Sequence, residues 1–301
     1  AVFMKDQLSK YITFVSENKR HWTFRCPYCG DSKTSSHGHL NIAKDMPVFR
    51  CVRCGQDGHI KALLNFLNAN DVVIPEFINE GKYSKKKYKT NNVKFDEPLE
   101  QYIEDYLKGR LQTTTIPSEL NIISSNTLSK LVYNAQNEYG KQQSFDKCIP
   151  FLSYRGRKVI SRILNNDKFR YYIYSLMDGN DFYVIKNKRK YSEYRKHNTI
   201  IIAEGTFDIA NQYIHRFVNT PDDAIYMCAN NQNFSAAFNL ARSIALCYSP
   251  NIILLADQDI DSSVYKKVVE KYRLKKLKIY KNKQGKDFGD FPVEPYLDLE
   301  I

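Results

Sequence analysis

From residue 199 onward, the sequence alternates between short apolar, β-branched runs and longer segments with helical periodicity. Such runs are typical of buried strands in a parallel sheet, and the segments between them provide the crossover helices. We therefore expect strands over 199–203, 224–228, 251–256 and 276–281, and helices over 206–216, 234–247 and 262–272. This order predicts a compact parallel α/β domain of about a hundred residues.

Acidic residues follow three of these predicted strands. They are Glu204 with Asp208, then Asp257, Asp259 and Asp261, and finally Asp287 with Asp290. A carboxylate just past a parallel strand lies at the carboxyl edge of the sheet, where open α/β folds place their sites. Carboxylates that converge there repel one another unless a hard cation joins them, which suits Mg²⁺ or Mn²⁺ and the transfer of phosphoryl groups. For Asp208 and Asp261, helix capping is the simpler interpretation.

Four cysteines form a second motif near the N-terminus. Two C-x2-C turns, separated by 21 residues, contain Cys26, Cys29, Cys51 and Cys54. Four thiolates suit a closed, structural Zn²⁺ site, and the short predicted strands 39–42 and 47–50 make this region a zinc ribbon. The alternatives are two disulfides or a redox C-x2-C pair. His37, His39 and His59 are expected to be ordinary surface residues, because four cysteines complete the zinc shell.

The net charge of +12 is unevenly distributed. Lys and Arg exceed Asp and Glu by 16 to 10 over residues 1–98 and by 17 to 10 over 99–198, whereas the counts are 12 to 13 over 199–301. A basic region upstream of an acidic site favours a polyanionic substrate such as nucleic acid, although charge that serves only solubility is the alternative.

Part of this basic excess lies in a predicted hairpin. Strands over 149–154 and 158–164 flank the turn Arg155-Gly156-Arg157, after helices over 99–107 and 125–139. With the following segment, the hairpin contributes the basic residues Arg155, Arg157, Lys158, Arg162, Lys168 and Arg170, interleaved with tyrosines. This pattern suits a nucleic-acid strand or nucleotide phosphates, but a generic solvated hairpin explains it equally well. Nearer the N-terminus, we expect a short helix within 4–20 and a second helix over 60–67.

Taken in order, these motifs resemble a known family. Glu204-Gly205-x-x-Asp208, Asp257-x-Asp259 and Gly285-Lys286-Asp287 resemble the Toprim domain, and a zinc ribbon followed by a basic segment and Toprim is the order of DnaG-type primases. Cys29 stands where cellular primases commonly have histidine, the last acidic motif departs from their K-D-P-D pattern, and the sequence ends at Ile301 without a helicase-binding domain. These departures are similar to the stand-alone primases of T4-type tailed phages.

The resemblance implies a role for each motif. Glu204, Asp257 and Asp259 would be catalytic and, with Asp287, would hold two or more Mg²⁺ or Mn²⁺ ions. Template or incoming nucleotide would contact the basic residues Arg157, Arg162, Lys168 and Arg170. The zinc ribbon would read the template, and the activity would be RNA primer synthesis on single-stranded DNA by nucleotidyl transfer from ribonucleoside triphosphates.

The same resemblance implies a multi-domain α+β architecture. We expect a zinc-ribbon domain over 1–80, a basic linker over 81–98, a basic N-terminal part of an RNA polymerase domain over 99–198 and a Toprim domain over 199–301. A replicative helicase is the expected partner, no membrane is involved, and the expected location is the cytoplasm of an infected bacterial host. Two alternatives remain: a non-enzymatic DNA-binding recombination mediator of the RecR type, and a Toprim nuclease.

Overall fold

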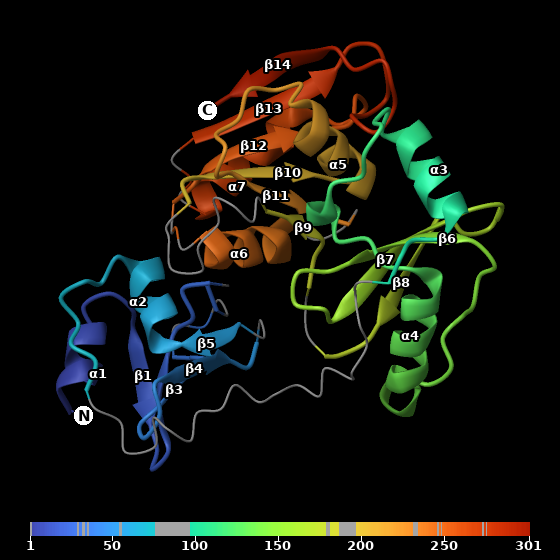
Figure 1. The fold of residues 1–301 in the computed structure, drawn as a ribbon. Helices are drawn as coiled ribbons and strands as arrows, with labels where there is room; N and C mark the ends of the chain where they lie inside the picture. Colours follow the sequence, from blue (N-terminus) through green and yellow to red (C-terminus); the bar gives the residue numbers. More distant parts are fainter. Residues whose placement is uncertain are drawn as a thin grey trace. The chain divides into compact units, whose positions relative to one another are not determined.

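The computed structural model describes residues 2–28, 30–31, 34, 36–53, 56–75, 97–178, 181–186, 197–230, 234–245, 247, 249–272, 274 and 276–301. The chain divides into two compact units. The first comprises Ala1–Lys89, Ser192–Lys196 and Phe238–Tyr248, and the second comprises Thr90–Tyr191, His197–Ala237 and Ser249–Ile301. The fold is mixed α/β with several sheets, as predicted (Figure 1). The predicted linker, 81–98, lies outside the described residues except for its last two positions.

The first unit is built on an antiparallel sheet whose five strands follow one another in chain order. They are β1 (Phe14–Glu17), β2 (His21–Phe24), β3 (Leu40–Ala43), β4 (Val48–Cys51) and β5 (Asp57–His59), accompanied by helices α1 (Val2–Leu8) and α2 (Ile60–Leu67). Helix α2 packs against β4 and β5. The ring of Tyr28 lies between those of Phe49 and Phe66, with centroids 5.7 and 4.2 Å away. These rings join the cysteine-bearing turn to the core of the unit.

The prediction of a helix within 4–20 is only partly correct. The helix ends at Leu8, and Phe14–Glu17 forms strand β1, which pairs with β2. The β-branched and aromatic residues after Tyr11 favour a strand once a partner is present. Strand β2 is absent from the sequence prediction, because a run of four residues carries little periodicity of its own.

The second unit contains a six-stranded sheet in the order β14-β13-β12-β10-β11-β9. Its strands are β9 (Val184–Ile185), β10 (Thr199–Ala203), β11 (Ile225–Cys228), β12 (Asn251–Leu255), β13 (Lys276–Asn282) and β14 (Pro295–Glu300). The four central strands are parallel, and the two at the edges pair antiparallel with their neighbours. All four predicted strands after residue 199 are thus confirmed, whereas the edge strands β9 and β14 are additions.

The helices that connect these strands also match the prediction closely. They are α5 (Thr206–His215), α6 (Phe234–Ala245), the 3₁₀ helix η3 (Ser262–Tyr265) and α7 (Lys266–Tyr272). Helix α5 packs against β10 and β11, where its apolar residues cover the sheet. No helix in the described part of the chain is long and apolar enough to cross a membrane.

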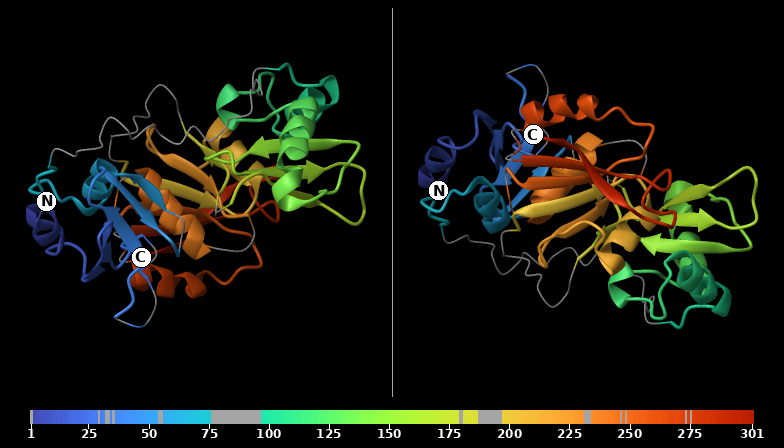
Figure 2. Two further views of the ribbon diagram at one scale, coloured as in Figure 1. Left: turned by 90° about the horizontal axis from the view of Figure 1, so that it is seen from below. Right: turned by 90° about the horizontal axis from the view of Figure 1, so that it is seen from above.

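A three-stranded antiparallel sheet forms the rest of the second unit. Its strands are β6 (Cys148–Leu152), β7 (Lys158–Ile163) and β8 (Tyr171–Ser175), and they are accompanied by α3 (Gln101–Arg110), η2 (Ser118–Leu120) and α4 (Ser125–Tyr139). The predicted hairpin is confirmed by the pairing of β6 with β7. Helix α4 lies along one face of this sheet (Figure 1 and Figure 2).

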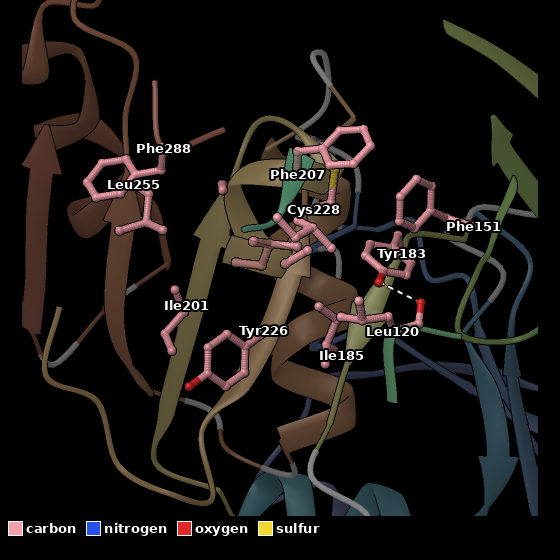
Figure 3. Packing of buried hydrophobic residues seen from close by; sticks show 14 of the residues in the cluster. Leu120, Phe151, Tyr183, Ile185, Ile201, Phe207, Tyr226, Cys228, Leu255 and Phe288 are labelled. Atoms are coloured by element: carbon pink, nitrogen blue, oxygen red, sulfur yellow. Dashed lines mark hydrogen bonds between the residues drawn. The ribbon is translucent and has the colours of Figure 1, made fainter. Parts of the chain in front are cut away.

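One hydrophobic core joins the two sheets of the second unit. Figure 3 shows the rings of Phe151, from β6, and Phe207, from α5, beside Tyr183, whose hydroxyl donates to the Leu120 carbonyl at 2.6 Å. The rings of Phe151 and Phe207 meet edge to face at 5.5 Å between centroids. Arg110 of α3 lies over the Phe207 ring. The contacts of Phe207 therefore fix the hairpin and α3 to the start of α5.

We expect Phe207→Ala to lower the free energy of unfolding by about 3–5 kcal/mol, because the side chain is only 4% exposed and its loss leaves a cavity between both sheets. Urea unfolding followed by circular dichroism measures the change. The matched control is Tyr133→Ala on α4, whose side chain is 69% exposed and should cost less than about 0.5 kcal/mol. Similar losses in both variants would contradict the central position of Phe207.

Candidate active site

Register places the predicted acidic residues at one edge of the six-stranded sheet. Strands β10 and β12 are parallel neighbours in which Ala203 pairs with Leu255, so the two strands end at the same level. Glu204 follows β10 directly, and Asp257 is the second residue after β12. Asp287 lies in the loop after β13, the next strand along the sheet. Three adjacent parallel strands therefore deliver carboxylates to one region, as the sequence pattern predicts.

The carboxylates at this edge influence one another. Burial raises the pKa of Glu204 from its ordinary value, and the charge of Asp257 adds to the rise. Burial likewise raises the pKa of Asp257, with Asp287 as the next cause. Lys286 offsets part of this repulsion, because its Nζ lies 3.6 Å from Asp257 Oδ2. The site is thus an acidic cluster with a single exposed ammonium beside it.

Asp208 belongs to this cluster more closely than the sequence suggests. Its carboxylate accepts a hydrogen bond from the Gly205 amide at 2.9 Å and caps α5, which confirms the capping interpretation. The side chain is also buried, and its pKa is raised well above the usual range by burial and then by Asp287 and Asp257. The sequence held one sign of this position: Asp208 lies four residues after Glu204, and residues four apart at the start of a helix lie on the same face.

Gly289 lets the Asp208 and Asp287 carboxylates approach each other. A Cβ at this position would lie 3.0 Å from Asp208 Oδ1 and 3.2 Å from Asp287 Oδ1. The Gly289 amide also donates to Asp287 Oδ1 at 2.8 Å. Phe288-Gly289 stands where K-D-P-D has a single proline: Gly289 lies close to both acids, and Phe288 is buried in the hydrophobic core.

Asp259 is exposed beyond the end of β12, and two further acids, Asp261 and Asp290, are bound elsewhere. Asp261 accepts a hydrogen bond from the Ser263 amide at 2.9 Å and caps η3, as predicted. Asp290 pairs with Arg110 of α3, with 2.5 Å between Asp290 Oδ1 and Arg110 Nη2. Asp290 therefore anchors a helix and does not join the cluster around Asp257.

The chemistry of the cluster suits a divalent cation, but the side chains are not yet arranged around one. Within the described ranges, no group of three or more His, Cys, Asp or Glu residues could hold a metal ion as it stands. The donors are carboxylate oxygens, the ligands that Mg²⁺ and Mn²⁺ prefer. Carboxylates with raised pKa values repel one another when ionised, and a cation removes that repulsion. Glu204, Asp257, Asp259 and Asp287 would therefore have to close around the ion.

The basic residues of the hairpin divide between two environments. Lys168 and Arg170 are exposed, and Arg162 lies over the Tyr171 ring at 5.2 Å. The Nε and Nη1 atoms of Arg162 are buried without a hydrogen-bond partner among the described residues. Burial raises the pKa of Tyr171 to about 12, so its phenol stays neutral beside this guanidinium. Arg162 thus keeps donors for an anion on the side of the hairpin that packs with α5.

Arg157 differs from the expectation of a template contact. Its side chain is only 8% exposed, and its charge opposes the rise in the pKa of Tyr139 on α4. The residue therefore lies on the α4 side of the hairpin, whereas Arg162 shares a face with Ile160. Arg157 belongs to the turn before β7, whereas Arg162 lies within the strand, so different parts of the hairpin position the two arginines.

A buried carboxylate holds the turn that carries Arg155 and Arg157. Asp181 accepts hydrogen bonds from the Ser153 hydroxyl at 2.5 Å and from the amides of Arg155 and Arg157 at 2.9 and 3.1 Å. Gly156 takes φ +68° in the middle of this turn, a conformation that other residues rarely adopt. Asp181 was absent from the sequence prediction, since it lies 24 residues beyond the turn.

The first unit contains the cysteine motif. Cys26 and Cys51 are buried, while Cys29 and Cys54 lie outside the described residues, so the four-cysteine site stays a prediction. Asp31 accepts hydrogen bonds from the amides of Cys26 and His39 at 2.9 and 3.0 Å, and from the His39 ring. The prediction that His39 is an ordinary surface residue is therefore wrong, because its amide and its ring both bond to Asp31, which supports the first cysteine turn.

Comparison with known proteins gives a limited result. No family model and no curated protein matches the chain. Among solved structures, it is similar to the zinc-binding and RNA polymerase domains of the Aquifex aeolicus primase, with 14% identity over 93% of this chain and 76% of that one and a TM-score of 0.39. It is also similar to a DnaG primase catalytic domain bound to single-stranded DNA, with 15% identity over 65% and 68% of the two chains and a TM-score of 0.45. At these values, the function has to be argued from the residues of this chain.

We expect Asp257→Asn to become increasingly stable relative to the wild type as pH rises above about 4 without divalent cations. An acid whose pKa is raised on folding, from an ordinary 3.8 here, binds more protons in the folded state, so its stabilising contribution is lost as pH rises through the raised value. Urea unfolding of both proteins in chelator between about pH 4 and pH 8 measures the difference.

Asp261→Asn is the matched control with the opposite sign. Hydrogen bonds from Ser263 lower the pKa of Asp261 from its ordinary 3.8, so this variant should lose stability relative to the wild type as pH rises towards about 4 and run parallel to the wild type at higher pH. Parallel pH profiles for Asp257→Asn and the wild type would contradict the coupling of the acidic cluster.

We expect Asp181→Ala to lower the free energy of unfolding by about 3 kcal/mol, because buried donors of the turn lose their acceptor. Urea unfolding followed by circular dichroism measures the change. Asp178→Ala, which removes a nearby exposed acid bonded to Tyr139, should cost less than about 1 kcal/mol. Equal behaviour of the two variants would contradict the role of Asp181.

Proposed function

We propose that this chain is a DNA primase of the DnaG type, which synthesises short RNA primers on single-stranded DNA by metal-dependent nucleotidyl transfer. The observation that carries the proposal is the acidic edge of the parallel sheet, where Glu204, Asp257 and Asp287 follow adjacent strands. Burial and the charges of Asp257 and Asp287 raise the pKa of Glu204, and burial and the charge of Asp287 raise that of Asp257. Such a cluster has the chemistry of a phosphoryl-transfer site. The motif order and the all-cysteine ribbon further favour the T4-type phage group within this class.

The proposed roles follow the geometry of the second unit. Glu204, Asp257, Asp259 and Asp287 would hold the cations. When bound, Mg²⁺ or Mn²⁺ lowers the pKa of an attacking 3′-hydroxyl and neutralises charge on the α-phosphate. Arg162, with its unsatisfied donors, is suited to a phosphate of the nucleotide or template, and Lys168 and Arg170 to the template backbone.

The proposal also covers the partners of the protein, its location and its zinc ribbon. The template is single-stranded DNA, the substrates are ribonucleoside triphosphates, and a replicative helicase would recruit the enzyme in the cytoplasm of an infected bacterium. Cys26, Cys29, Cys51 and Cys54 would hold the structural zinc of a template-reading ribbon. The buried positions of Cys26 and Cys51 are consistent with zinc ligands.

We expect the full chain to make short RNA products from labelled ribonucleotides on some single-stranded templates in the presence of Mg²⁺ or Mn²⁺. Asp257→Asn should reduce this rate at least about a hundredfold, because it removes a ligand of the reacting metal ions. Asp261→Asn, an exposed acid four residues away that only caps η3, should retain activity. Gel analysis of products on templates of varied sequence measures the rates.

The same assay separates the alternatives. Degradation of the template without any need for ribonucleotides would indicate a Toprim nuclease, and binding of DNA without metal or polymerisation would favour a mediator of the RecR type. Full activity of Asp257→Asn would contradict the proposed mechanism. Cys51→Ser should lose template-dependent products, since a broken zinc site disorders the ribbon.

A further inference from the structure

Lys281 is a buried lysine near the end of β13. The side chains of Leu277 and Ile279 precede it on the same face of the strand, and both are buried and apolar. Lys281 is itself only 7% exposed. A lysine in such a position is rare unless its ammonium is paired, because removing the charge from water is costly. If this position served only for packing, an aliphatic residue such as Leu277 or Ile279 would fill it equally well.

The ammonium of Lys281 contacts both sides of the loop that carries Asp259. Its Nζ donates to the Ile260 carbonyl at 2.6 Å and lies 3.5 Å from the Gln258 carbonyl. The third neighbour is Asp298 on β14, with 3.4 Å between Nζ and Oδ2. Three acceptors match the three donors of an ammonium. The two carbonyls are those immediately before and after Asp259 in the chain.

Asp298 is in turn held in place by the same loop. The hydroxyl of Ser262 donates a hydrogen bond to Asp298 Oδ2. The acid, the ammonium and the hydroxyl therefore form a connected group that spans β14, β13 and the start of η3. Asp298 supplies the counter-charge that allows the ammonium to remain buried.

Among the described residues, the other hydrogen bonds of this loop involve the neighbours of Asp259 and not its carboxylate. Gln258 is tied through its amide to the Lys286 carbonyl at 2.9 Å, and its side chain donates to the Asn282 carbonyl. Asp259 is exposed and lies beyond the end of β12. Among the described residues, its carboxylate is thus positioned through its neighbours, and Ile260, the neighbour on the far side, is held by Lys281 and by a hydrogen bond from its amide to the Asp257 carbonyl at 3.2 Å.

We propose that Lys281 is a positioning residue for Asp259, which fixes the direction of that carboxylate by binding the carbonyls on both sides of it. The inference rests on the proposed metal site. Lys281 cannot itself bind a cation, because its ammonium is positively charged. Electrostatic repulsion alone would make loss of Lys281 tighten cation binding. Positioning predicts the opposite, because a misdirected ligand weakens the site. Whether loss of Lys281 weakens or tightens cation binding therefore distinguishes positioning from electrostatic repulsion.

The test measures Mn²⁺ binding to the full chain by electron paramagnetic resonance, and backbone amide exchange by mass spectrometry without metal. We expect Lys281→Met to weaken Mn²⁺ binding by about tenfold or more, as for other residues that orient metal ligands. We also expect faster exchange over residues 257–261 with unchanged exchange in β12. Lys278→Met is the matched control, because Lys278 lies on the same strand, is partly exposed and pairs only with Glu300 among the described residues.

A second variant guards against loss of folding in Lys281→Met. Asp298→Asn keeps the ammonium but removes its counter-charge, and should also weaken Mn²⁺ binding and speed exchange over 257–261. Unchanged or tighter Mn²⁺ binding in Lys281→Met, with unchanged exchange, would overturn the inference. If the wild type fails to bind Mn²⁺, the proposed metal site is wrong, and amide exchange alone then decides whether Lys281 holds the loop.

Discussion

The parallel register of β10, β12 and β13 is the constraint on which the second unit depends. Because the strands end at one level, it brings like charges to a single edge and buries some of them, which raises the pKa values of Glu204, Asp208 and Asp257. The surrounding structure accommodates this repulsion. Amide donors bind Asp208 and Asp287, and Gly289 gives them room.

The basic hairpin faces this acidic edge through a shared core. Phe151 and Phe207 pack across the junction between the two sheets, and Tyr183 is bonded to Leu120 behind them. This core matters because Arg162 belongs to β7 of the three-stranded sheet, and close packing of that sheet against α5 places it relative to the acidic cluster. The hairpin and the acidic edge therefore act as one body and not as two separately placed motifs.

Local pattern predicted most of the fold but little of the support for the site. The central strands and helices after residue 199 were correct because buried runs and helical periodicity are local signals. Strands β2, β9 and β14 were missed because they are short or polar and form only against a partner. Asp181 and Asp298 were missed for a related reason, since each accepts a hydrogen bond from a residue more than 20 positions away, Arg157 and Ser262 respectively. Lys281 did leave a signal, as a charge in the apolar register of Leu277 and Ile279.

Two lysines near the acidic edge illustrate how burial decides the role of a charge. The Lys286 side chain is 60% exposed and pairs with Asp257, whose side chain is 14% exposed, so the ammonium can return to water when the pair separates. A cation at the proposed site would therefore be able to replace it. The Lys281 side chain is 9% exposed and is bonded to backbone carbonyls, so it cannot leave without unpairing buried groups. The first lysine offsets part of the charge of the cluster and could be displaced at the proposed metal site, whereas the second is bonded to the backbone on both sides of Asp259.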